Sequence, residues 1–87
     1  MPKHVKMMIL DTCPHCKRAF QMMNELMTAN PAYREVKFEV IEEQTEPQKT
    51  EGYDYRYVPT FFIGDVKVHE GTPTAEALEM VFKKALE

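Results

Sequence analysis

Two cysteines separated by two residues are the feature of this chain that points most directly to chemistry. They are Cys13 and Cys16, with Pro14 and His15 between them. In a small protein this spacing indicates either reversible disulfide exchange or metal ligation. A disulfide across so short a loop constrains the unfolded chain very little, so stabilisation is not the expected use of the pair.

The surroundings of the pair favour disulfide exchange. Pro14 suits the first position of a helix, which places Cys13 at the N-cap. There the free backbone N–H groups of His15 and Cys16 and the positive end of the helix stabilise a thiolate. Cys16 follows one turn later, within disulfide reach of Cys13. We therefore predict that Cys13 is the nucleophile and that Cys16 resolves the mixed disulfide.

His15 and the possibility of a metal site require separate consideration. A charged imidazole between the sulfurs would stabilise the thiolate, so His15 is predicted to tune the redox potential; an exposed histidine without a role is the alternative. A different class of function is a metal-binding or trafficking module with Cys13 and Cys16 as thiolate ligands. One Cys-x-x-Cys supplies only two of four ligands, so such a site needs a second chain, and we expect no metal site in the monomer. A redox-inert domain that binds proteins is the third possibility.

Apolar patterning predicts a strand–helix–strand unit around the cysteines. Residues 5–10 are almost continuously apolar, as in a strand buried on both faces. A helix is expected from Pro14 until Asn30-Pro31 ends it. Residues 36–40 alternate between apolar and charged side chains, as a strand does. This order implies a parallel pair of strands joined by a right-handed crossover.

The second half of the chain predicts a helix, a hairpin and a final helix. Capping-box spacing at residues 45–48 predicts a short helix that runs toward Gly52. Residues 60–63 and 66–70 are expected to pair antiparallel across Gly64-Asp65. Thr72 is predicted to cap a last helix that Pro73 opens. The order β-α-β-α-β-β-α describes one α/β domain over residues 1–87, a four-stranded mixed sheet with helices on both faces.

Composition and charge narrow the list of partners. The net charge is −3 and no run of basic residues occurs, which argues against nucleic acid. No apolar stretch reaches the length of a membrane span or a secretory signal. We therefore predict a cytoplasmic monomer without a membrane partner, in a compartment where structural disulfides are rare.

Three motifs match a known family. They are Cys-Pro-His-Cys after the first strand, the Tyr-Val-Pro-Thr-Phe-Phe-Ile run at 57–63, and Gly-Thr at 71–72. With them the chain resembles glutaredoxins and small thioredoxin-like redoxins over nearly its whole length. The resemblance implies a thioredoxin-like fold in which Pro59 is cis and faces the dithiol, while the backbone of Val58 pairs with an extended substrate.

The resemblance also implies an activity and its partners. The protein is expected to be a thiol–disulfide oxidoreductase acting on protein or small-molecule disulfides, with no bound cofactor. Electrons would come from glutathione as co-substrate or from a thioredoxin-reductase-type flavoprotein. Two departures weigh against glutathione: His15 replaces the aromatic residue usual in glutaredoxins, and Glu70 replaces a glycine where its charge would repel a glutathione carboxylate. Thr72 would contribute to that carboxylate site at the N-terminus of the last helix.

One further residue is expected beside the dithiol. Of the alternating tyrosines Tyr53, Tyr55 and Tyr57, only Tyr57 is predicted to face a substrate, and the other two are expected to pack against the sheet edge. The predicted substrate-binding residues are therefore Pro14, Tyr57, Val58, Pro59 and Thr72.

Overall fold

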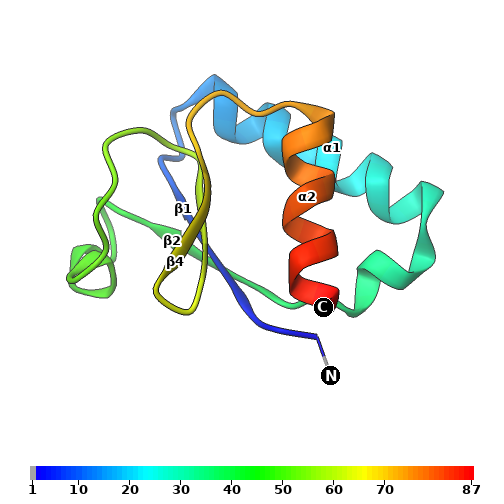
Figure 1. Cartoon of the computed structure of the whole chain (residues 1–87). Coiled ribbons are helices and arrows are strands. Elements are labelled where there is room, and N and C mark those ends of the chain that lie inside the picture. Colours follow the sequence, from blue (N-terminus) through cyan, green and yellow to red (C-terminus); the bar gives the residue numbers. More distant parts are fainter. Residues whose placement is uncertain (1) are drawn as a thin grey trace.

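The computed structural model describes residues 2–87 as one sheet with two α-helices (Figure 1). The order is β-α-β-β-β-α, with a 3₁₀ turn on either side of the second strand. The elements are β1 (Val5–Ile9), α1 (Pro14–Ala29), η1 (Pro31–Glu35), β2 (Phe38–Glu42), η2 (Pro47–Thr50), β3 (Thr60–Ile63), β4 (Val66–Glu70) and α2 (Ala75–Leu86).

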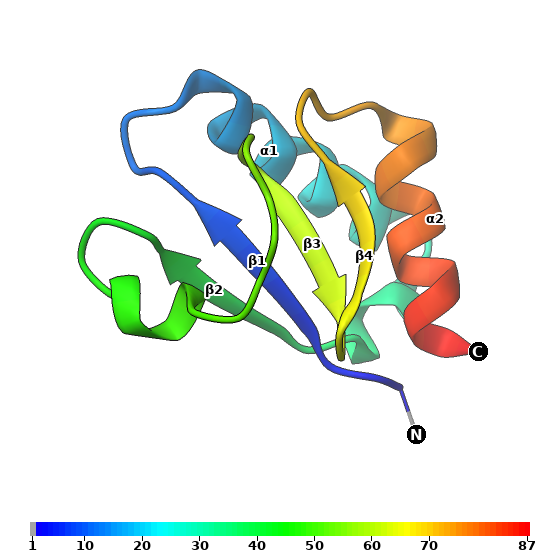
Figure 2. The same ribbon diagram turned by 60° about the vertical axis from the view of Figure 1, so that its left-hand side comes forward.

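The sheet has the predicted mixed topology. Its strand order is β2-β1-β3-β4 (Figure 2). β1 pairs parallel with β2, and the antiparallel pairs are β1 with β3 and β3 with β4. The parallel pair is connected through α1, as expected for a strand–helix–strand unit. Gly64, with φ +60°, makes the tight β3–β4 turn with Asp65, because a left-handed backbone there suits glycine.

α1 begins and ends where its sequence signals place it. Pro14 is in the first turn, and the helix stops before Asn30, whose side-chain oxygen accepts a hydrogen bond from the Ala32 N–H at the start of η1. The face of α1 that turns to the sheet buries Cys16, Ala19 and Met23. Those three positions recur at helical spacing, which is why the apolar pattern located this helix.

The second strand lies two residues later than predicted. Val36 is buried but follows η1 outside the strand, and β2 runs from Phe38 to Glu42. Val40, expected on the buried face, is 40% exposed, because β2 is an edge strand of the sheet. Ile41 is instead the buried residue of this strand, on the opposite face.

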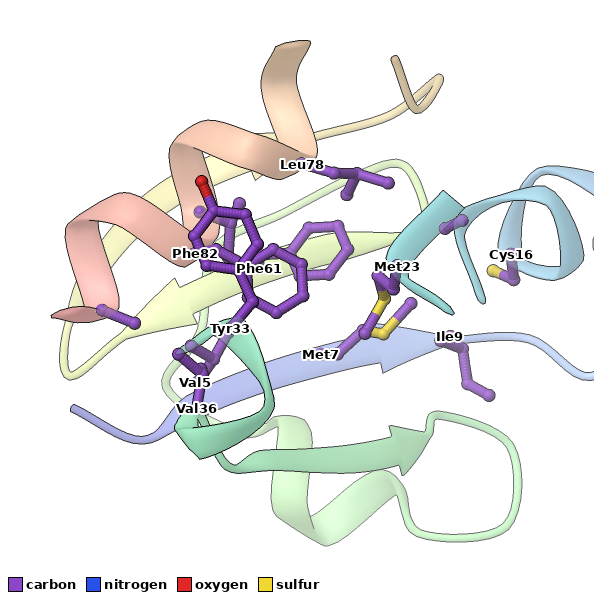
Figure 3. Close-up of a cluster of buried hydrophobic side chains, with 13 residues drawn as sticks. Val5, Met7, Ile9, Cys16, Met23, Tyr33, Val36, Phe61, Leu78 and Phe82 are labelled. Atoms are coloured by element: carbon purple, nitrogen blue, oxygen red, sulfur yellow. The ribbon is translucent and has the colours of Figure 1, made fainter. Parts of the chain in front are cut away.

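The main core lies between the sheet and the two α-helices (Figure 3). Met7 from β1, Phe61 from β3 and Phe82 from α2 are fully buried there. Tyr33 of η1 stacks on Phe82, with ring centroids 4.7 Å apart, and its hydroxyl donates to Glu79. Cys16 lies at one end of this cluster, so the dithiol borders the core.

Within residues 2–87 no α-helix covers the other face of the sheet, which corrects the prediction of helices on both faces. The helix expected from residue 45 is a single 3₁₀ turn, η2, without buried residues. Tyr53 and Tyr55 cover Phe62, with ring centroids 4.8 Å and 6.3 Å away. A packing role was predicted for both, but they pack on the face of the sheet over the central strand β3 and not at its edge. An irregular segment rich in tyrosine thus takes the place of a helix.

Both ends of the described chain lie at one end of the molecule. The Lys3 N–H donates to the Ala85 carbonyl at 2.7 Å, which joins the segment before β1 to the last turn of α2. In both views the loop before α1 lies at the opposite end of the sheet (Figures 1 and 2). Neither α-helix in residues 2–87 combines the length and the apolar character that a membrane crossing requires.

Candidate active site

Cys13 occupies the N-cap of α1, as predicted. Its backbone is extended, with φ −85° and ψ 119°, and Pro14 follows in the first turn. The Cys13 N–H donates to the Leu10 carbonyl at 3.0 Å, and its own carbonyl accepts from the Cys16 N–H at 3.1 Å. These bonds fix Cys13 between the end of β1 and the start of α1.

The Cys13 thiol does not face the helix amides, in contrast to the prediction. The cap makes no side-chain hydrogen bond, and Sγ instead donates to the Val58 carbonyl at 3.9 Å. A protonated thiol is a donor and only a weak acceptor, so it turns toward a carbonyl, whereas a thiolate is a strong acceptor for backbone N–H groups. The helix N-terminus is therefore available to the ionised sulfur.

Cys16 lies in a different environment from Cys13. Its side chain is 2% exposed, whereas Cys13 is partly exposed. Burial first, and then the charge and hydrogen bonding of the neighbouring Cys13, together raise the pKa of the Cys16 thiol to about 11, against a hydrogen bond with the Leu10 backbone that lowers it. The two thiols are close together, but only one opens to solvent.

The segment before β3 faces the dithiol. The Val58–Pro59 peptide bond is cis, as the family resemblance implied. Pro59 is buried, and its carbonyl accepts from the Gly71 N–H at 2.9 Å. Gly71 has φ +95°, a conformation that favours glycine. The chain after β4 is thereby tied to the proline, and Val58 is presented to Cys13.

A groove of about 460 Å³ opens beside Cys13. Of the predicted site residues it brings together Cys13, His15, Tyr57, Val58 and Thr72. Pro14 and Pro59 do not line it: the first is exposed on α1 and the second is buried beneath the groove.

Two lining residues, Arg56 and Gly71, were not predicted as site residues. Gly71 belongs to the Gly-Thr motif of the family resemblance, so that motif carries a signal for its place in the groove. Arg56 lies in an irregular segment, and no local pattern places its side chain. Arg56 gives the groove a fixed positive charge.

Thr72 is not the cap of the last helix, which corrects the prediction. Thr74 is the N-cap: its hydroxyl accepts from the Ala77 N–H at 3.1 Å, and α2 begins at Ala75. Pro73 is fully buried, so it packs against the fold instead of opening the helix. Thr72 remains in the loop, where its carbonyl lies 3.1 Å from His69 Nε2.

Among residues 2–87, no three His, Cys, Asp or Glu side chains are grouped as a metal site would require. His69 lies on β4 and contacts the Thr72 carbonyl. The metal-binding alternative would therefore need ligands beyond Cys13 and Cys16 from another molecule.

Comparison with known proteins places the chain in a family. A thioredoxin domain model matches residues 3–83, so the chain belongs to the thioredoxin-domain family. It is 40% identical over 75 residues to a thioredoxin of Methanocaldococcus jannaschii, with 85% of each chain covered. A solved structure of a malarial protein has a TM-score of 0.71 at 12% identity over the full length of both chains, and this likeness concerns the fold alone.

These matches confirm the thioredoxin-like part of the expected resemblance and the fold class. They support a redox oxidoreductase of the thioredoxin family in general. The glutaredoxin-like part of the resemblance stays a prediction.

Proposed function

We propose that this protein is a thiol–disulfide oxidoreductase that exchanges electrons with protein or low-molecular-weight disulfides through Cys13 and Cys16. One observation carries the proposal: the two thiols differ in access. Cys13 borders an open groove at a helix N-terminus, and Cys16 is buried behind it. An incoming disulfide can therefore meet only Cys13, which supports the nucleophilic role proposed for it.

In the reducing direction, the Cys13 thiolate attacks one sulfur of the substrate disulfide. That disulfide breaks, a new S–S bond joins Cys13 to the attacked sulfur, and the other substrate sulfur leaves as a thiolate. The N-terminal end of α1 stabilises the negative charge on Cys13 before the attack. Substrate thiolate and mixed disulfide are the products of this first step.

Cys16 completes the exchange. Its thiolate attacks Sγ of Cys13, forms the intramolecular disulfide and releases the second substrate sulfur as a thiolate, while the Cys16 proton passes to a released sulfur. Two electrons have then moved from protein to substrate. In the mixed disulfide Cys13 carries no charge, so its contribution to raising the Cys16 pKa is lost and that pKa falls. Cys16 thus becomes more reactive only after Cys13 has reacted.

The groove is the proposed binding site for the substrate. Val58, ahead of the cis-Pro59, pairs through its backbone with an extended substrate, and Tyr57 and Thr72 form the sides of the groove. His15 lies on the helix side and tunes the thiolate.

The proposed electron donors follow from the same chemistry, and the proposed location and monomeric state rest on the sequence analysis. Glutathione or a reductase flavoprotein supplies electrons, no bound cofactor is required, and the protein acts as a cytoplasmic monomer.

The test equilibrates the purified protein across ratios of reduced to oxidised glutathione and reads the thiol state by mass spectrometry. We expect a reversible intramolecular disulfide in the wild type, a glutathione adduct on Cys13 in Cys16→Ser, and almost none in Cys13→Ser. Thiols that resist oxidation, or equal adducts in the two variants, would overturn the proposal. A stoichiometric metal in the purified protein would favour the metal-binding alternative.

A further inference from the structure

Glu70, the last residue of β4, directs its carboxylate back into the protein. One carboxylate oxygen accepts the backbone N–H groups of Arg56 and Tyr57, the latter at 2.9 Å. The other oxygen accepts from Lys67 Nζ at 2.7 Å. The Glu70 side chain is only 21% exposed. Its charge is therefore neutralised within the fold, and the sequence-based expectation that it repels a substrate carboxylate loses its basis.

Further bonds hold the same segment. Lys67 Nζ also donates to the Asp54 carbonyl at 3.0 Å. The Thr60 hydroxyl donates to the Tyr57 carbonyl. Residues 54–57 form neither helix nor strand. Their backbone is thus held by side chains of the β3–β4 hairpin, and we call the Glu70–Lys67 pair with these bonds the clamp.

The clamped segment is one wall of the groove. Arg56, Tyr57 and Val58 all line it. The Tyr57 side chain is 67% exposed, so packing of its ring does not fix its position. Val58 packs against both buried clusters, so core packing fixes that end of the wall. Arg56 and Tyr57 are held through their backbone, and Glu70 accepts both of their N–H groups.

We propose that Glu70, supported by Lys67, is a positioning residue that holds the Arg56–Val58 wall in the conformation that binds the substrate. The inference rests on the proposed function, since it concerns the same groove. Glu70 lies behind the wall and touches neither sulfur, so it acts through the backbone of Arg56 and Tyr57. The hydrogen bond from Lys67 and those from the two amides lower the pKa of Glu70 to about 2, so the clamp is charged at every pH at which the thiols react.

A positioning role predicts a specific kinetic pattern. Without the clamp the wall samples several conformations, and substrate binding must order it. A tenfold rise in KM corresponds to about 1.4 kcal/mol, which is within the cost of fixing one residue's backbone. The reacting sulfurs are untouched, so kcat should stay within about twofold. General loss of stability would instead reduce the active fraction and lower kcat.

The experiment compares Glu70→Ala and Glu70→Gln with a matched control. Glu46→Gln removes an acid that pairs with Lys49 at 2.8 Å with the same three-residue spacing, at the N-cap of η2 and outside the lining of the groove. Steady-state reduction of a disulfide peptide gives KM and kcat, and amide hydrogen exchange reports on residues 56 and 57. In Glu70→Ala we expect faster amide exchange at residues 56 and 57 and an about tenfold higher KM. Glu70→Gln should show smaller changes in both, because its amide oxygen still accepts hydrogen bonds. Glu46→Gln should change neither.

Several results would overturn the inference. Faster exchange at residues 56 and 57 with an unchanged KM would mean that the wall is not needed for binding. An unchanged exchange rate would mean that Glu70 does not hold the wall. If Glu70→Ala does not fold, Glu70→Gln and Lys67→Met test the inference instead, through KM, kcat and amide exchange at residues 56 and 57. The activity of the wild type is measured before any variant is compared. If the wild type reduces no disulfide, the proposed function itself is wrong.

Discussion

The two single-serine variants should differ strongly in thiol reactivity. Cys13→Ser leaves only Cys16. Burial, the largest cause of its raised pKa, remains in the variant, whereas the smaller contributions from the charge and hydrogen bonding of Cys13 are removed, so we expect the pKa to stay above the ordinary 9.0 but below its value in the wild type. A pKa above the ordinary value lowers the thiolate fraction of Cys16 at pH 7 relative to an unperturbed thiol, by about tenfold for each pKa unit. Its 2% exposure slows any reagent further. We therefore expect Cys16 to alkylate at least about tenfold more slowly than an exposed model thiol, and far more slowly than Cys13 in Cys16→Ser.

Iodoacetamide alkylation followed by mass spectrometry measures this difference directly. Rates over a pH series from about 6 to about 11 should rise in Cys13→Ser toward the upper end of the range. In denaturing urea the two variants should react at similar rates, because the difference comes from the fold. Equal rates at pH 7 in the folded variants would refute the assignment of Cys13 as nucleophile and Cys16 as resolving thiol.

Three further predictions concern stability. Phe61→Ala removes a fully buried ring and should lower the free energy of unfolding by about 3–5 kcal/mol in urea titrations; a loss below about 1 kcal/mol would contradict the described core. Thr74→Ala should cost about 1 kcal/mol and Thr72→Ala less, and the reverse order would restore Thr72 as the cap. The pKa of Glu70 is about 2 in the folded protein and ordinarily 4.5. The ionised carboxylate therefore stabilises the fold above pH 4.5, and this stabilisation is lost as the pH falls toward 2. In thermal unfolding, the melting temperature of Glu70→Gln should fall less steeply with decreasing pH than that of the wild type. Equally steep falls in the two proteins would refute this prediction.

Local signals located most of the secondary structure. Pro14 and Asn30 bound α1 because each acts on its immediate backbone neighbours, and Gly64 permits a turn that few other residues do. The N-cap position of Cys13 followed directly from Pro14 at the start of the helix. The parallel strand pair followed from the order of elements, without any knowledge of side-chain contacts.

Features that depend on distant contacts were not predictable in the same way. Thr72 and Thr74 are both plausible caps, and burial of Pro73 against the rest of the protein decides between them. The sequence predicts an unpaired charge at Glu70. Its hydrogen bonds with Lys67 and with the backbone amides form only in the folded chain, so no local pattern indicates them. The Val58 carbonyl as acceptor for Cys13 likewise requires that residues 45 positions apart are brought together.

The hydrogen bond between Lys3 and Ala85 has a practical consequence for attachment. Because the described chain enters and leaves at the end of the sheet away from the groove, a fusion partner, affinity tag or surface linker at either end would project away from Cys13 (Figures 1 and 2). The protein can therefore be tethered by one end while its dithiol stays open to large disulfide-containing proteins. The short gap between the ends also makes the molecule suitable for circular permutation, with a new opening in the exposed Gly64-Asp65 turn.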